Sequence, residues 1–174
     1  MLKRVLIIRF SSFGDIVQAM GLISSLKEKF PEVQIDWLTK SQFSNLVSLD
    51  SNISNVYGIS DGGDDTGIST IAKTISNGDY DLIYDAHFSL RSIFLWLYSK
   101  LICRCKSKWI FRPKSRLKRF LLFKFRVNMF PRPFVGRSSY ITPLSEYGIS
   151  KRWIASNWVF DKLKFMNFKN LPDS

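Results

Sequence analysis

Residues 5–15 read VLIIRFSSFGD, a short apolar run that passes into a polar turn. An amphipathic segment covering residues 16–30 follows the turn directly. This order of strand, turn and helix is typical of the first unit of a parallel α/β sheet, in which ligands bind at the carboxyl ends of the strands. The turn has one glycine, Gly14, and so lacks the three-glycine dinucleotide fingerprint. It places one carboxylate, Asp15, at the start of the predicted helix.

The rest of the chain alternates strand-like and helix-like segments. We predict strands at about residues 3–9, 33–39, 55–59, 80–86 and 108–111. We predict helices at about residues 15–29, 41–49, 68–76, 90–102, 114–127 and 137–147. This alternation indicates an α/β fold, a Rossmann-like and mostly parallel sheet with helices on both faces. A length of 174 residues corresponds to one domain.

Several motifs together resemble one enzyme family. These are RFSSFGD at residues 9–15, LKEKFP at 26–31, QIDWLT at 34–39, YDLIYDAH at 80–87 with LRS at 90–92, and Ser139-Tyr140 with Leu144 and YGI at 147–149. The pattern is similar to that of the bacterial glycosyltransferases that add heptose to lipopolysaccharide, family 9 of the glycosyltransferases. The match covers about residues 1–150 and is strongest in the first forty.

The resemblance implies the N-terminal half of a GT-B glycosyltransferase, an architecture of two facing Rossmann-like domains. Residues 1–150 would form the acceptor-binding domain, residues 151–174 a C-terminal tail or the start of an interdomain linker, and the donor-binding domain would be absent. The implied reaction transfers heptose, with inversion, from a nucleotide-activated donor such as ADP-heptose to an anionic lipid-linked core sugar. It implies neither a metal nor a cofactor. Whether the half-length chain acts alone stays open, and a separate donor-binding domain is an expected partner.

Asp15 is the candidate catalytic residue. The resemblance gives it the role of the base that accepts the proton of the acceptor hydroxyl. The start of a helix favours the ionised form of a carboxylate, which lowers its proton affinity. The alternative interpretation is that Asp15 only caps the helix through backbone N–H groups.

The candidate acceptor-binding residues fall into two groups. Ser11, Ser12 and Gly14 would let backbone N–H groups of the turn approach a sugar or phosphate, or would simply form the turn. The cations Arg91, Lys114, Arg116, Lys118 and Arg119 would bind its negative charge, or would be solvated surface residues. We expect His87, the only histidine, to pack or to form a hydrogen bond at a strand end.

Charge is concentrated in one segment. Residues 100–137 carry 13 Lys or Arg and no Asp or Glu, whereas the rest of the chain holds 13 basic and 14 acidic residues. Such a segment attracts anions, which favours a glycolipid or a membrane surface as the partner. Within it, residues 114–127 alternate basic and apolar side chains, as in a helix on anionic lipid or in an ordinary surface helix. No nucleic-acid-binding module is recognisable, so we expect no specific nucleic acid, and nucleic-acid binding is kept only as a third alternative after glycosyl transfer and glycolipid binding.

The alternative function is a non-catalytic cationic module that binds anionic glycolipid at the membrane surface. No apolar run approaches the ~20 residues of a membrane-spanning helix, and no signal peptide is evident. We therefore expect a cytoplasmic protein, peripheral at the inner face of the membrane. Cys103 and Cys105 do not have the spacing of a metal site, and we expect reduced thiols.

One further motif has two interpretations. Residues 65–67, Asp-Thr-Gly, look like the motif with which the second domain of the family holds its sugar nucleotide. Here the motif lies in the first domain, and residue 70 is Thr where the family has histidine. We interpret it as the start of a helix, with a displaced donor site as the alternative.

Overall fold

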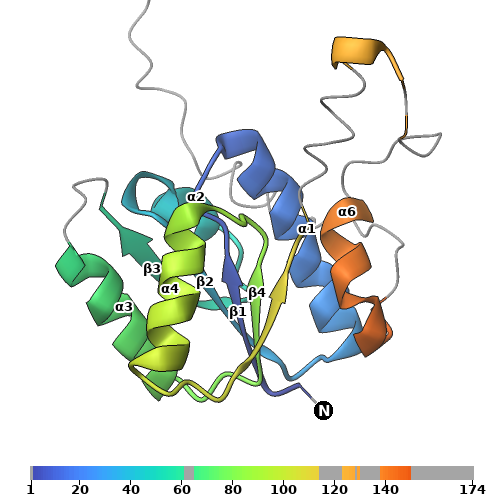
Figure 1. Ribbon diagram of the computed structural model, residues 1–174. Helices are drawn as coiled ribbons and strands as arrows, with labels where there is room; N and C mark the ends of the chain where they lie inside the picture. Colours follow the sequence, from blue (N-terminus) through green and yellow to red (C-terminus); the bar gives the residue numbers. More distant parts are fainter. Residues whose placement is uncertain (1, 61–64, 114–122, 128, 130–137, 150–174) are drawn as a thin grey trace, which may run out of the picture.

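The computed structural model describes residues 2–60, 65–113, 123–127, 129 and 138–149. Five strands form one sheet in this part of the chain (Figure 1). They are β1 (Arg4–Ile8), β2 (Gln34–Lys40), β3 (Ile53–Ile59), β4 (Leu82–Asp85) and β5 (Lys108–Phe111). Their order in the sheet is β3-β2-β1-β4-β5, and every neighbouring pair is parallel. The predicted parallel α/β sheet is confirmed.

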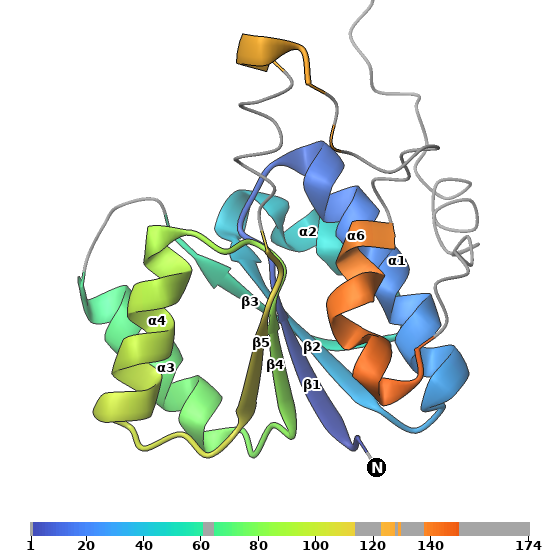
Figure 2. The same cartoon turned by 45° about the vertical axis from the view of Figure 1, so that its right-hand side comes forward.

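Helices cover both faces of this sheet, also as predicted (Figure 2). One face carries α1 (Phe13–Lys29) and α6 (Ser138–Ile141), and the other carries α3 (Asp65–Asn77) and α4 (Leu90–Leu101). The described residues also contain η1 (Ser41–Phe43), α2 (Ser44–Val47) and η2 (Thr142–Tyr147), and residues 123–125 are helical as well. Among the described residues, the helices are all too short or too polar to cross a bilayer.

Alternation along the strands divides the core into two layers. Val5 and Ile7 of β1 pack in the cluster that includes α1 and α6, whereas Leu6 and Ile8 pack in the cluster that includes α3 and α4. Successive strand residues point to opposite faces, so a run of four apolar residues fills both layers. This explains why the first strand reads as a continuous apolar run.

The element boundaries lie close to the predicted ones, with small differences. The first helix begins two residues earlier than predicted, because Ser12 and not a later residue is its N-cap. The predicted helix at 137–147 is divided into α6 and the 3-10 helix η2, which has Pro143 in its first turn. The motif at 65–67 starts α3, as predicted. Most of the predicted basic helix at 114–127, and the whole tail at 151–174, lie outside the described residues.

A buried carboxylate ties four strand segments together. Asp36 of β2 is fully buried and accepts hydrogen bonds from Arg4 Nη2 at 2.8 Å, Asn55 Nδ2 at 2.9 Å and the Tyr80 hydroxyl at 2.5 Å. Burial, together with the hydrogen bond to Asp36, raises the pKa of the Tyr80 hydroxyl. Because these donors come from β1, β3 and the residues before β4, this network fixes the strands relative to one another.

Candidate functional site

The sheet order reverses between β1 and β4, and the candidate site lies at the carboxyl ends of these strands. The ladder continues one residue beyond the strands. Arg9 N donates to Leu38 O at 2.9 Å, Ala86 N to Ile8 O at 3.0 Å and Arg112 N to Asp85 O at 2.9 Å. The side chains that follow the strands are therefore held on a fixed edge of the sheet.

Arg9 is the buried cation of this edge. It directly follows β1, and only 5 % of it is exposed. Its guanidinium pairs with the carboxylate of Asp15 and donates from Nη1 to the carbonyl oxygen of Ala86 at 2.7 Å. Arg9 thus links the end of β1, the end of β4 and the first turn of α1.

Asp15 lies in the first turn of α1, and 44 % of its side chain is exposed. Besides Arg9, its carboxylate accepts from the Ser12 hydroxyl at 3.3 Å and from the Tyr140 hydroxyl at 3.2 Å. Partial burial raises the pKa of Asp15, but the charge of Arg9 and the hydrogen bonds from Tyr140 and Ser12 outweigh it and hold that pKa below its usual range. The carboxylate is ionised at neutral pH and still open to solvent on one side.

The capping interpretation of Asp15 stays a prediction. Ser12 is the N-cap residue of α1, and its hydroxyl donates to the Asp15 carboxylate at 3.3 Å. The contacts with Arg9 and Tyr140 go beyond what a cap requires. Asp15 therefore joins the first turn of α1 to Arg9 and to Tyr140.

Tyr140 of α6 is held from the far side by a second cation. The Arg112 guanidinium lies 3.7 Å from the centroid of the Tyr140 ring and donates to Ser139 Oγ at 2.7 Å. The Tyr84 hydroxyl donates to the Tyr140 carbonyl oxygen at 2.7 Å. Residues in or just after β4 and β5 thus fix Tyr140 where its hydroxyl reaches Asp15.

The predicted acceptor-binding residues differ in where they lie relative to Asp15, and the structure describes only some of them. Ser11, Ser12 and Gly14 lie in the turn and first helical residues around Asp15, and a Cβ added at Gly14 would meet nothing within 4 Å. Arg91 lies in the first turn of α4, and within the described part of the chain no hydrogen bond or ion pair joins it to Asp15. Its role stays a prediction. Four predicted cations lie outside the described residues: Lys114, Arg116, Lys118 and Arg119.

His87 packs at the edge, as we expected from the sequence. Its ring meets that of Phe10 edge-on, with the centroids 5.4 Å apart. The buried carboxylate of Asp85 accepts from the backbone N–H groups of His87 and Phe88 at 2.9 and 2.8 Å. This turn shapes the chain between β4 and α4.

Sequence reasoning missed three residues of the site: Arg9, Arg112 and Tyr140. Arg112 directly follows the predicted strand at 108–111, and Arg9 is the last residue of the predicted strand at 3–9, so their places at strand carboxyl ends were a usable signal. Tyr140 belongs to the motif at 139–149, but only the fold brings it to a carboxylate 125 residues away.

Neither metal nor disulfide chemistry is indicated by the described residues. They contain no group of three or more His, Cys, Asp or Glu side chains placed to hold a metal ion. Cys103 and Cys105 are unpaired, and Cys105 Sγ donates to Ser107 Oγ at 3.3 Å.

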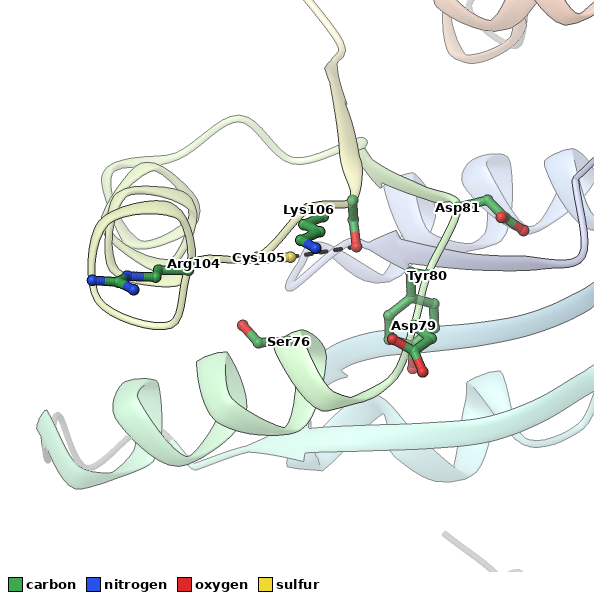
Figure 3. Close-up of a pocket in the computed structure, with 8 residues that line it drawn as sticks. Ser76, Asp79, Tyr80, Asp81, Arg104, Cys105 and Lys106 are labelled. Atoms are coloured by element: carbon green, nitrogen blue, oxygen red, sulfur yellow. Dashed lines mark hydrogen bonds between the residues drawn. The ribbon is translucent and has the colours of Figure 1, made fainter.

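A pocket of about 420 Å³ lies at the opposite, amino-terminal edge of the sheet (Figure 3). Its lining includes both carboxylates, Asp79 and Asp81, and cations, Arg104 and Lys106. The Asp81 carboxylate is bound by the backbone N–H groups of residues 3 and 4 at 2.7 and 2.9 Å. Since ligands of parallel α/β sheets bind at the carboxyl edge, Asp15 and not this pocket marks the candidate site.

Comparisons with known proteins agree with the fold. The sequence matches no family model and no curated protein sequence. The structure is similar to a family 9 glycosyl transferase from Veillonella parvula, with a TM-score of 0.64 and 15% identity over 99% of this chain and 51% of that one. It is also similar to E. coli heptosyltransferase WaaC with ADP-2-deoxy-2-fluoro heptose, with a TM-score of 0.67 and 16% identity over 94% of this chain and 54% of that one.

A third solved structure agrees with these two. E. coli ADP-heptose lps heptosyltransferase II matches with a TM-score of 0.59 and 15% identity over 94% of this chain and 50% of that one. This chain therefore spans about half the length of the solved structures it resembles. At these identities the likeness establishes a shared fold.

Proposed function

We propose that this chain is the acceptor-binding half of an inverting glycosyltransferase of the heptosyltransferase type. The donor would be a nucleotide-activated heptose such as ADP-heptose, and the acceptor an anionic lipid-linked core sugar at the inner face of the membrane. The observation that carries the proposal is the carboxylate of Asp15, ionised and partly open at the point where the sheet order reverses. The shared fold and the motif at residues 9–15 support it.

The proposed chemistry at Asp15 is general base catalysis. As the acceptor hydroxyl oxygen bonds to the anomeric carbon of the donor, the bond from that carbon to the phosphate oxygen breaks. The hydroxyl proton passes to a carboxylate oxygen of Asp15, and attack from the face opposite the leaving phosphate inverts the anomeric centre. Groups that stabilise the departing diphosphate would come from a donor-binding half.

Arg9 and Tyr140 set the state of this base. Together with Ser12 they keep the Asp15 carboxylate ionised and hold it in position, but the same contacts lower its proton affinity. A base of low pKa works when the proton moves late, after the hydroxyl oxygen has become acidic through bonding to the anomeric carbon. In this proposal Arg9 and Tyr140 are positioning residues.

An anionic acceptor suits the charge of the chain. The formal net charge is +12, and all of this excess lies in residues 100–137. Of that segment, Arg112 reaches the edge where Tyr140 contacts Asp15. Clustered cations would concentrate a phosphorylated acceptor there.

The test is reconstitution of transfer. The chain is co-expressed with the donor-binding half of a heptosyltransferase of this fold, and heptose transfer from ADP-heptose to a lipid-linked core acceptor is measured. We expect transfer with the wild-type chain and a loss of about 10²–10⁴-fold with Asp15→Asn, the usual contribution of a general base. Equal transfer by both would contradict the role of Asp15.

The second candidate is a non-catalytic module that binds anionic glycolipid. The observation that favours it is the concentration of the whole net positive charge in residues 100–137. It predicts glycolipid binding that survives Asp15→Ala, with no transfer in any pairing. Nucleic-acid binding would instead weaken steeply with salt, and its absence at low salt removes that possibility.

A further inference from the structure

The outward face of α4 is apolar, which is the reverse of an ordinary surface helix. Leu90, Phe94, Leu97 and Leu101 follow one another at helical spacing and are 76, 62, 36 and 72 % exposed. Ile102, just after the helix, is 65 % exposed. A helix of a globular protein normally turns such a stripe toward the core and its polar residues toward water.

The inward face of α4 explains why the helix is oriented in this way. Its buried residues are Ser92, Leu95 and Ser99, two of which are small and polar. Small side chains let the helix lie close to the sheet, and the large ones are left outside. The outward stripe continues into a groove of about 560 Å³ between α3 and α4, lined mainly by apolar side chains that include Ile68 and Tyr98.

Cations flank this stripe along the chain, and two of them, Arg104 and Lys106, also line the pocket that holds Asp79 and Asp81. Residues 86–113 carry six Lys or Arg and no Asp or Glu. Arg91 lies in the first turn of α4, and Arg104 and Lys106 are exposed in the loop that follows the helix. An apolar stripe with flanking cations is the combination that binds an anionic lipid surface.

We propose that the exposed face of α4, which we call the α4 stripe (Leu90, Phe94, Leu97, Leu101 and Ile102), docks this protein on an anionic bilayer. The apolar side chains would enter the region between headgroups and acyl chains, while Arg91, Arg104 and Lys106 meet the lipid phosphates. A second copy of the chain fits this face less well, because the same cations would then face one another. The α4 stripe would be the surface that holds the protein at the membrane location given in the proposed function. Only the purpose of this docking rests on that function.

The geometry suits a lipid-linked acceptor. Helices α1 and α4 both begin after a strand's carboxyl end, so Leu90 and Asp15 lie at the same edge of the sheet (Figure 1). A bilayer on the α4 stripe would pass beside that edge. A sugar attached to a lipid in the bilayer could then reach Asp15 while its lipid stays in place.

The experiment measures binding of the full chain to vesicles without any glycolipid. One set contains phosphatidylglycerol and phosphatidylcholine in equal amounts, the other phosphatidylcholine alone. We expect binding to the anionic set, and a fall of about tenfold or more in the partition coefficient for Phe94→Ser/Leu101→Ser. The matched control, Phe13→Ser/Val17→Ser, removes two exposed apolar side chains from α1 on the opposite face and should bind like the wild type.

A second variant tests the cations. Arg104→Gln/Lys106→Gln should reduce binding to the anionic vesicles by about fivefold or more and leave binding to phosphatidylcholine unchanged. Because both side chains are exposed, this variant should fold even if the stripe variant does not. Circular dichroism checks each fold.

Three outcomes would overturn the proposal. The first is a wild-type chain that does not bind the anionic vesicles, and the second is a folded stripe variant that binds like the wild type. The third is a wild-type dimer, seen by light scattering, that Phe94→Ser/Leu101→Ser separates. Since the vesicles hold no acceptor and no donor, failure here leaves the transfer experiment unaffected, and Asp15→Asn should still bind the vesicles.

Discussion

Asp15 has a pKa below its usual range because burial is outweighed by the charge of Arg9 and by hydrogen bonds from Tyr140 and Ser12. A carboxylate held in this way contributes stability wherever it is ionised in the folded state. That stability is present above the unfolded pKa, about 3.9, and is lost as the pH falls through the lower, folded value. A contribution of Asp15 to stability that is lost as the pH falls therefore indicates its contact with Arg9.

Asp15→Asn should be less stable than the wild type at neutral pH, and the difference should disappear in acid. The expected size is below about 1 kcal/mol, because solvent screens a side chain exposed to this degree. Urea unfolding at several pH values measures it. Arg9→Met is the control, since in that background Asp15→Asn should lose most of its pH-dependent effect. A difference that grows in acid would contradict the ion pair.

Substitution of Gly14 distinguishes an effect on folding stability from an effect on acceptor binding at the turn. A Cβ there meets nothing within 4 Å, so Gly14→Ala should fold, and better helix propensity should stabilise the chain by up to about 1 kcal/mol. If the acceptor approaches the turn backbone, the same methyl group should weaken acceptor binding. Gly67→Ala in α3, also in open space, is the matched control and should leave binding unchanged. Thermal unfolding and acceptor titration give the two readouts, and equal binding by both variants would remove Gly14 from the site.

Among the elements, β2 is the strand that holds the sheet together at its amino-terminal half. Its Asp36 is fully buried and accepts from β1, from β3 and from the residue that precedes β4 by two positions. Removing one partner of a buried ion pair leaves Arg4 without its charge partner and the donors unsatisfied. The position of Arg9 at the far end of β1 depends on this alignment.

Asp36→Ala should lower the free energy of unfolding by about 3–5 kcal/mol. Glu32→Ala, which removes an exposed carboxylate, should change it by no more than about 0.5 kcal/mol. Denaturant titration followed by circular dichroism measures both. An equally small effect at the two positions would show that the network does not hold the sheet.

The elements were also what the sequence predicted best. Periodicity located every strand to within about two residues, and the turn at 9–15 placed Asp15 at a strand's carboxyl end. Periodicity does not tell which side of α4 meets the sheet, so the apolar stripe on its outer face was not foreseen. Nor does it bring Tyr140 to Asp15, since that contact depends on how α6 packs on β4 and β5.

In the whole molecule, the proposed acceptor site and the α4 stripe lie on neighbouring parts of the surface. The carboxyl edge of the sheet carries Asp15 with Arg9 and Tyr140, and the neighbouring helical face carries the α4 stripe. The pocket beside Arg104 lies at the other edge. An acceptor that is bound for transfer must contact the carboxyl edge of the sheet at Asp15.

Titration of the chain with a soluble, phosphorylated core sugar lacking its lipid, followed by amide NMR, maps where the acceptor binds. We predict saturable shifts at residues 11–15 and at Tyr140, strongly reduced in Asp15→Asn and Arg9→Met. Residues 79–81 and 104–107 around the opposite pocket should not move. Saturable shifts confined to that pocket, or none at residues 11–15, would contradict an acceptor site at Asp15.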